Sequence, residues 1–124
     1  MIYYGYPRCS TSRKGEKWLT DRNISYEFRD ITKDTPSVED LKKWHKDSGM
    51  ELKKFFNTSG MKYRELDLKN RLADMSDEEK YQLLASEGML IKRPIVIDGA
   101  AVLIGFREKE WTEHFEHARS GEKV

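Results

Sequence analysis

The sequence contains a single cysteine, Cys9, which opens the segment Cys-Ser-Thr-Ser-Arg at residues 9–13. An aromatic strand pattern precedes Cys9 and a helical pattern follows it, so its thiol lies at the predicted N-terminus of a helix. The unpaired N–H groups of a helix N-terminus favour a thiolate over a thiol, and Arg13 in the first turn acts in the same direction. The alternative is a small hydrophobic residue in the core, but the polar neighbours of Cys9 disfavour full burial.

The same turn also predicts an anion site. The backbone N–H groups of residues 10–13 and the hydroxyl groups of Ser10, Thr11 and Ser12 can surround an oxyanion beside the thiol. Ser12 stands where a Cys-x-x-Cys motif would place its second thiol. The segment therefore predicts a site that binds an anion and attacks it with one sulfur atom.

A second segment whose residue types could take part in binding or catalysis is Lys-Arg-Pro-Ile-Val at residues 92–96. Pro94 comes directly before a predicted strand, a position that is compatible with a cis peptide bond. The planar guanidinium of Arg93 suits a tetrahedral oxyanion, because its N–H groups can donate parallel hydrogen bonds. The alternative for Arg93 is an ordinary surface charge.

The elements around Cys9 form a predicted β-α-β unit. Residues 1–6 are rich in strand-forming side chains, residues 10–22 have an apolar face with a helical period, and residues 24–31 alternate as a half-buried strand does. Because such crossovers are right-handed, we expect the two strands to be parallel.

The middle of the chain carries helical signals. Thr35 as a cap, Pro36 at the first helical position and Gly49 at the end predict one helix. Shorter helical patterns follow, the last of which begins with a capping arrangement at Ser76. We predict an all-helical insertion at about residues 36–88.

The last part of the chain returns to strands. Asp98-Gly99 lies between two β-rich runs and predicts a hairpin turn, and residues 107–121 predict an amphipathic helix. The order β-α-β, helices, β-β-α predicts an α/β protein with a mixed central sheet and a thioredoxin-like fold, in a single domain over residues 1–124. This fold would place the loop at Arg93 opposite Cys9.

Composition excludes several classes of protein. The 23 basic and 22 acidic residues nearly cancel, and no block of like charge indicates a nucleic-acid surface. One cysteine cannot form an internal disulfide, and no apolar stretch has the length of a membrane span. The three histidines complete no metal-ligand pattern. We therefore expect a cytoplasmic protein with no metal site, no membrane contact and no direct contact with nucleic acid.

Four segments resemble one protein family. The segment Cys-Ser-Thr-Ser-Arg is similar to the Cys-x-Thr-Ser-Arg signature of glutaredoxin-linked arsenate reductases, and residues 90–98 are similar to their Arg-Pro-Ile-Val segment. Residues 55–66 and 102–111 resemble the broader arsenate reductase (ArsC) and Spx family, with a leaning to its Spx-like branch. The resemblance covers nearly the whole chain and implies a thioredoxin-like fold.

The resemblance also implies a mechanism. Cys9 would be the nucleophile, Arg93 beside Pro94 would bind the oxyanion, and Thr11, Ser12 and Arg13 would lie in the anion loop. In the family, the thiolate attacks arsenate, glutathione displaces the adduct as co-substrate, and glutaredoxin reduces the mixed disulfide. No tightly bound cofactor is implied, and Ser12 is consistent with an external thiol reductant.

Two positions depart from the reductase pattern. Asn57 stands where the family carries a substrate arginine, and Asn57 supplies a hydrogen-bond donor without charge. Arg107 is a candidate for a further arginine but stands next to the matching position rather than on it. A glutathione mixed disulfide is therefore an alternative substrate to a small oxyanion.

Other functions remain open from the sequence. An Spx-like regulatory protein would bind the α subunit of RNA polymerase, and Ser12 would remove the Cys-x-x-Cys redox switch of such regulators. A further alternative is a family member whose site has degraded and whose fold serves another interaction.

Overall fold

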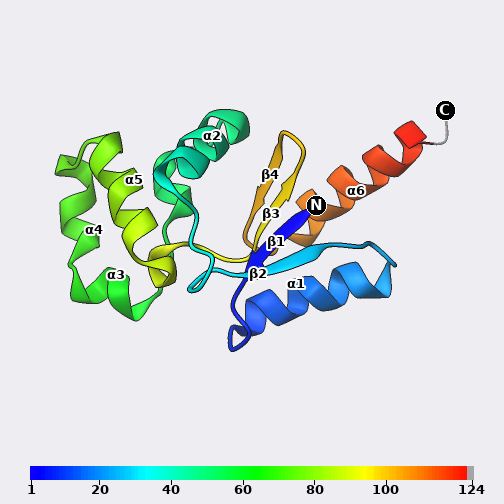
Figure 1. The fold of residues 1–124 in the computed structure, drawn as a ribbon, viewed down its shortest axis with the longest axis horizontal. Helices are drawn as coiled ribbons and strands as arrows, with labels where there is room; N and C mark the ends of the chain where they lie inside the picture. Colours follow the sequence, from blue (N-terminus) through cyan, green and yellow to red (C-terminus); the bar gives the residue numbers. More distant parts are fainter. Residues whose placement is uncertain (123–124) are drawn as a thin grey trace.

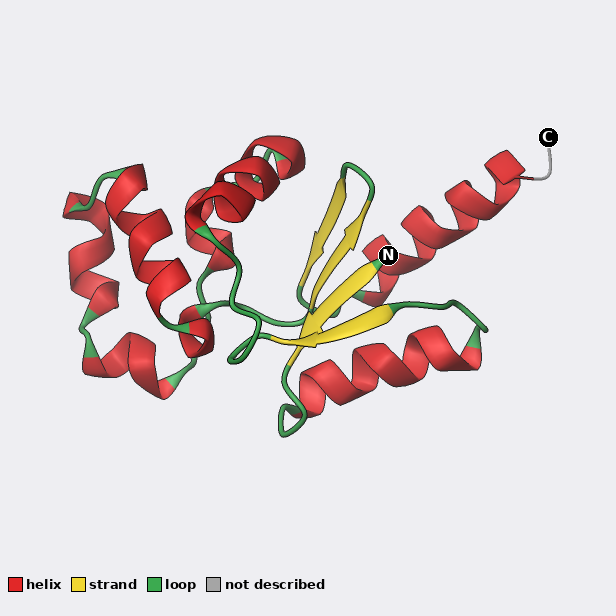
Figure 2. Cartoon of the chain, in the orientation of Figure 1, coloured by secondary structure: helices red, strands yellow, loops and turns green. Residues whose placement is uncertain are grey.

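The computed structural model describes the backbone of residues 1–122 and the side chains of residues 1–116. A four-stranded mixed sheet with the order β2-β1-β3-β4 forms its centre (Figures 1 and 2). β1 (Ile2–Gly5) pairs in parallel with β2 (Glu27–Asp30). Antiparallel pairing joins β1 to β3 (Ile95–Asp98) and β3 to β4 (Ala101–Ile104). The predictions of an α/β fold, a mixed sheet and a parallel first pair are confirmed.

Two helices flank the sheet beside these strands (Figure 1). α1 (Ser10–Asp21) connects β1 to β2, and α6 (Glu108–Glu122) follows β4. All elements between β2 and β3 are helical: α2 (Val38–Ser48), η1 (Leu52–Phe55), α3 (Met61–Glu65), α4 (Leu68–Arg71), η2 (Leu72–Asp74), α5 (Asp77–Ser86) and η3 (Gly88–Leu90). None of the described helices is both long enough and apolar enough to cross a membrane.

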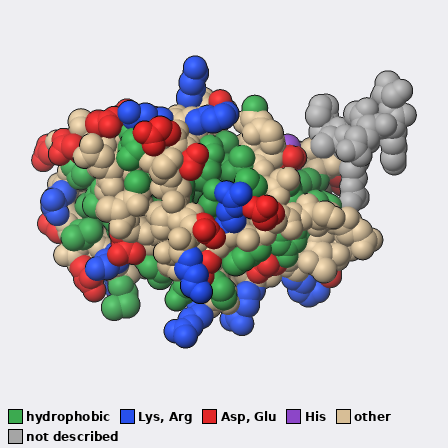
Figure 3. All heavy atoms as spheres, viewed as in Figure 1, with side chains coloured by type: hydrophobic (Ala, Val, Ile, Leu, Met, Phe, Trp, Pro, Cys, Tyr) green, Lys and Arg blue, Asp and Glu red, His purple; other side chains and the backbone are tan. Residues whose placement is uncertain are grey.

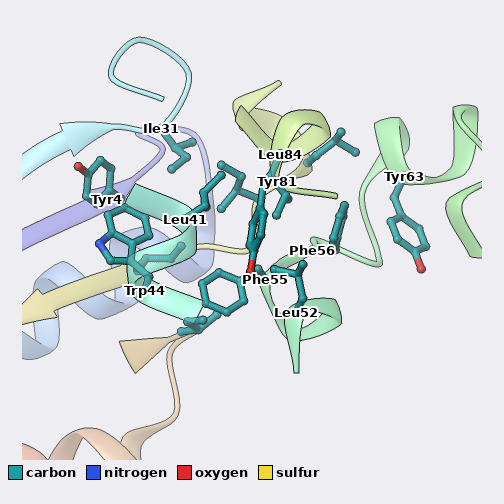
Figure 4. Packing of buried hydrophobic residues seen from close by; sticks show 14 of the residues in the cluster. Tyr4, Ile31, Leu41, Trp44, Leu52, Phe55, Phe56, Tyr63, Tyr81 and Leu84 are labelled. Atoms are coloured by element: carbon teal, nitrogen blue, oxygen red, sulfur yellow. The ribbon is translucent and has the colours of Figure 1, made fainter. Parts of the chain in front are cut away.

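Alternation along the strands builds a core on each face of the sheet, because neighbouring side chains of a strand point to opposite sides. Tyr3 packs with α1 and α6, where Trp18 and Trp111 meet edge to face with ring centroids 5.6 Å apart. Tyr4 faces the other core, which the sheet shares with the helical segment. Figure 4 shows this second core, whose members include Ile31, Leu41, Trp44, Leu52, Phe55, Phe56, Tyr81 and Leu84.

α2 begins later than the sequence predicts. Its N-cap is Ser37, whose hydroxyl accepts from the Asp40 N–H at 3.1 Å while the Asp40 carboxylate accepts from the Ser37 N–H at 3.2 Å. Thr35 instead donates its hydroxyl to the carbonyl of Ile31 at 2.8 Å. Ser37 is the cap because this reciprocal pair satisfies two backbone N–H groups. The predicted end at Gly49 is confirmed, with a φ of +65°.

β2 (Glu27–Asp30) is shorter than its pattern indicates, since it covers only part of the predicted strand 24–31, and Phe28 is 36% exposed. The reason is that β2 is an edge strand whose partner, β1, offers only the four residues Ile2–Gly5 for pairing. β3 begins directly after Pro94, as the sequence predicts, because proline has no N–H to donate to a neighbouring strand.

Candidate active site around Cys9

Cys9 lies at the junction of β1 and α1, as the N-cap of the helix, and its side chain is partly exposed. Its N–H donates to the carbonyl of Tyr6 at 2.9 Å, and its carbonyl accepts from the Arg13 N–H at 3.0 Å. These two bonds hold the Cys9 backbone in an extended conformation at the start of the helix. The predicted placement of the thiol at a helix N-terminus is thus observed.

The surroundings of the sulfur favour its thiolate form. Partial burial opposes the ionisation of Cys9, but the N–H and hydroxyl of Ser12 and the guanidinium of Arg93 together lower the Cys9 pKa below its usual value. Hydrogen-bond donors and a positive charge both stabilise the anion. Cys9 therefore carries a larger fraction of the nucleophilic thiolate at neutral pH than an ordinary cysteine does.

Ser12 is held in place by the first strand. It is fully buried, its hydroxyl accepts from the Tyr6 N–H at 3.1 Å, and its carbonyl accepts from the phenol of Tyr3. Burial raises the Tyr3 pKa well above its usual range, so the phenol remains a neutral donor. Since the Ser12 oxygen already accepts one bond, its own proton is free to point toward Cys9.

Ser12→Ala tests this arrangement. We expect a higher Cys9 pKa, slower alkylation at neutral pH and a loss of about 1–3 kcal/mol of stability, because the Tyr6 N–H loses its acceptor. The measurements are the pH profile of alkylation and urea unfolding. Ser10→Ala is the matched control, since Ser10 is exposed on the same turn. Equal effects of the two substitutions on the pH profile would contradict a specific role for Ser12.

Arg93 reaches the site from the loop before β3, where the Arg93-Pro94 peptide bond is cis. Its Nη1 donates to the carbonyls of Met89 and Ile91 at 3.4 Å each, and its Cζ lies 5.6 Å from the centroid of the Tyr6 ring. Its Nε is buried and has no hydrogen-bond partner among the described residues. The guanidinium acts on the sulfur, since it contributes to the lowered pKa of Cys9.

An open cleft with a volume of about 1130 Å³ contains most of the predicted site. The predicted residues that line it come from four separate parts of the chain: Cys9, Thr11, Asn57, Arg93 and Arg107. Tertiary structure therefore brings these five residues to one cavity.

Four predicted residues lie outside the lining of the cleft. Ser12 and Pro94 are buried, and Ser12 acts on Cys9 from within the protein. Ser10 and Arg13 are exposed on α1. The Arg13 N–H already donates to the Cys9 carbonyl, so it is not open to an anion as the sequence predicts.

The two positions that depart from the reductase pattern have different environments. Asn57 follows η1 and is partly buried, and its side-chain oxygen accepts from the Ser59 hydroxyl at 3.3 Å. The Arg107 side chain is 66% exposed and forms an ion pair with Glu110 at 3.2 Å. Asn57 adds no charge and the charge of Arg107 is shared with a carboxylate, so Arg93 is the main cation beside the sulfur.

Sequence reasoning missed several residues of the site. Tyr6 does not line the cleft, but its ring faces the Arg93 guanidinium, and its place between β1 and Cys9 was a signal. Four lysines also line the cleft, and two of them, Lys53 and Lys54, immediately precede the segment that contains Asn57. The full set is Lys53, Lys54, Lys62 and Lys92.

The model of the ArsC family matches residues 4–114 of the sequence. The chain belongs to the ArsC family. The uncharacterised protein YusI of Bacillus subtilis is 50% identical to this ArsC family member over 115 residues, which are 93% of this chain and 98% of YusI. The predicted family and its thioredoxin-like fold are thereby confirmed.

Solved structures agree with this assignment. An ArsC family related protein from Bacteroides fragilis has a TM-score of 0.88 and 48% identity, with 90% of this chain and 94% of that chain covered. A possible arsenate reductase from Streptococcus mutans has a TM-score of 0.82 and 43% identity, with 89% and 95% covered. The ArsC family member described here shares its fold with both.

Regulators are also similar to this ArsC family member. The regulatory protein MgsR of Bacillus subtilis is 27% identical over 89% of this chain and 86% of its own length. The global transcriptional regulator Spx 2 of Bacillus cereus is 26% identical over 89% of this chain and 82% of its own length. The chain is therefore similar both to a protein named as a possible arsenate reductase and to proteins named as regulators.

Proposed function

We propose that the chain is a thiol-dependent oxidoreductase in which Cys9 is the nucleophile, glutathione is the co-substrate and glutaredoxin is the external reductant. One observation carries this proposal. A partly exposed thiol lies at a helix N-terminus and opens onto a cleft, beside Ser12 and Arg93, which lower its pKa. This arrangement suits nucleophilic attack better than it suits a structural cysteine.

The chemistry needs no second cysteine. The Cys9 thiolate attacks the glutathionyl sulfur of a glutathione mixed disulfide, so that the old S–S bond breaks and a disulfide forms between Cys9 and glutathione. The released thiolate keeps the electron pair of the broken bond and takes a proton from water. A thiolate of reduced glutaredoxin then attacks the glutathionyl sulfur of this disulfide, which restores the Cys9 thiolate and leaves the glutathionyl group on glutaredoxin. A glutathione thiolate removes that group from glutaredoxin, and glutathione disulfide forms. The oxidising equivalents thus leave on glutathione, and Ser12 can support the thiolate instead of resolving the disulfide.

The test is a coupled assay with glutathione and glutaredoxin, supplied in turn with arsenate and with a glutathionylated peptide. Turnover of arsenate supports a reductase of the arsenate type. Turnover of the peptide alone supports a thiol transferase. Absence of turnover with both substrates contradicts the proposed function.

Arg93→Met tests the cation beside the sulfur. We expect the Cys9 pKa to rise and the rate with either substrate at neutral pH to fall by about tenfold or more, because a charge-assisted contact to the thiolate is lost. The control is Arg13→Met, which removes an exposed arginine from the same site region. The role assigned to Arg93 is wrong if both variants keep the wild-type pH profile of alkylation.

The second candidate is a regulator that binds the α subunit of RNA polymerase. The similarity to MgsR and Spx 2 over most of the chain favours it. Such a regulator would lack the Cys-x-x-Cys switch, because Ser12 occupies the second position. A pull-down with purified RNA polymerase is the test, and failure to recover the α subunit would argue against this candidate.

A further inference from the structure

The cleft at Cys9 is large for a small oxyanion. Its volume of about 1130 Å³ is slightly above the range of about 300–1,000 Å³ that is usual for small-molecule pockets. It extends from Cys9 and Thr11 at the start of α1 to residues of η1 and α3. A tetrahedral oxyanion at the sulfur would leave most of this volume unused, so the cleft has room for a substrate with an extended body.

Positive charge is concentrated in the cleft. Two carboxylates, those of Glu51 and Glu110, line it against six cationic side chains, an excess of four positive charges. The whole chain has a net charge of only +1, so the remainder of the chain is net negative. Figure 3 shows acidic and basic side chains interspersed over the face that it draws. The cationic side chains of the cleft are Lys53, Lys54, Lys62, Lys92, Arg93 and Arg107.

Three of these cations come from the helical segment. Lys53 and Lys54 lie on η1 and form no ion pair with any described residue, and Lys62 on α3 has only a distant contact to Glu65 at 3.8 Å. By contrast, Arg107 is paired with Glu110 at 3.2 Å. The lysines of η1 and α3 therefore have charge available for a ligand.

Apolar side chains accompany the lysines. Met50, Met61 and Met89 line the same cleft, and Met61 is 69% exposed. Methionine side chains are flexible and polarisable, so they pack against irregular apolar groups. Together with the lysines, they match a ligand that has carbon chains and more than one anionic group.

We propose that the cleft selects a low-molecular-weight disulfide with an anionic body, and that Lys53, Lys54 and Lys62 bind the anionic groups while Cys9 attacks the sulfur. This inference rests on the proposed function, in which Cys9 is the nucleophile. When Cys9 attacks, the S–S bond of the substrate breaks and a new S–S bond forms between the Cys9 Sγ and one of the two substrate sulfurs. The other sulfur leaves as a thiolate with the electron pair of the broken bond. The lysines act on binding alone, and the step needs no further oxidant or reductant.

The experiment measures mixed-disulfide formation on Cys9 by intact mass spectrometry. The probes are glutathione disulfide, which is anionic, bis(2-hydroxyethyl) disulfide, which is neutral, and cystamine, which is cationic. Wild-type protein is compared with the triple variant Lys53→Gln/Lys54→Gln/Lys62→Gln. The control triple variant, Lys33→Gln/Lys46→Gln/Lys69→Gln, removes the same charge from exposed lysines that do not line the cleft. Circular dichroism and thermal unfolding check that each variant is folded.

We expect the ratio of the rate with glutathione disulfide to the rate with the neutral disulfide to fall about tenfold in the cleft variant. The same ratio stays near the wild-type value in the control, and the ratio for cystamine moves in the opposite direction. Added salt lowers the wild-type ratio as well, because it screens exposed charges.

Three results overturn the inference, and the third is distinguishable from the first two because it concerns Cys9 itself. If the two triple variants change the ratio equally, or if salt leaves the wild-type ratio unchanged, Cys9 is reactive but the lysines do not select an anion. If Cys9 reacts with none of the three disulfides, the proposed function fails and this inference fails with it.

Discussion

Cys9→Ser should abolish turnover of arsenate and of glutathione mixed disulfides while the protein stays folded. A serine hydroxyl cannot form the disulfide with glutathione, and at neutral pH it is a far weaker nucleophile than a thiolate. Because serine is a favoured N-cap residue and Cys9 occupies the N-cap of α1, the substitution leaves the start of the helix intact. The measurements are the coupled assay and intact mass spectrometry after incubation with glutathione disulfide.

The same variant separates the two candidate functions. An oxidoreductase loses all activity, whereas a regulator without a redox switch keeps its binding to the RNA polymerase α subunit. Cys9→Ala is the matched control, because it also removes the sulfur but lacks the capping oxygen. Residual turnover of Cys9→Ser near the wild-type level would refute the role of Cys9 as nucleophile.

Gly88→Ala should destabilise the protein by about 3 kcal/mol or more, a large effect for one added methyl group. A Cβ atom at Gly88 would collide with the carbonyl oxygen of Ile31 and lie 2.8 Å from its carbonyl carbon and 3.1 Å from the Cα of Thr32. These are backbone atoms, so relief needs the chain after β2 to move away from η3. Urea unfolding measures the loss, with the m-value as a check that unfolding remains two-state.

Gly49→Ala is the control for this prediction. Gly49 has a φ of +65°, and apart from its own chain neighbours no heavy atom of the described residues would lie within 4 Å of a Cβ there. Its substitution therefore costs only the left-handed conformation, about 1–2 kcal/mol. A Gly88→Ala variant that unfolds no earlier than Gly49→Ala would show that the segments at Ile31 and Gly88 separate easily.

Local signals in the sequence predicted much of the fold. The change from a strand pattern to a helical one located Cys9 at the start of α1, because alternation and helical periodicity are properties of adjacent residues. The cap at Ser76 is confirmed, with reciprocal hydrogen bonds to Glu79 at 3.1 Å each. The cap of α2 was missed because Thr35 and Ser37 are both suitable caps, and the partner at Asp40 decides between them.

The sequence by itself determined the place of its single cysteine at the start of a helix, the order of the elements and, by resemblance, the family. Only the tertiary structure decided what surrounds the sulfur. In the folded protein Ser12 is buried, and the Arg13 N–H donates to the Cys9 carbonyl. Asn57, Arg107 and the lysines of η1 and α3 line one cleft with Cys9. The reason is physical: a helix start depends on neighbours a few residues apart, whereas a cleft depends on how distant segments pack, which no local pattern records.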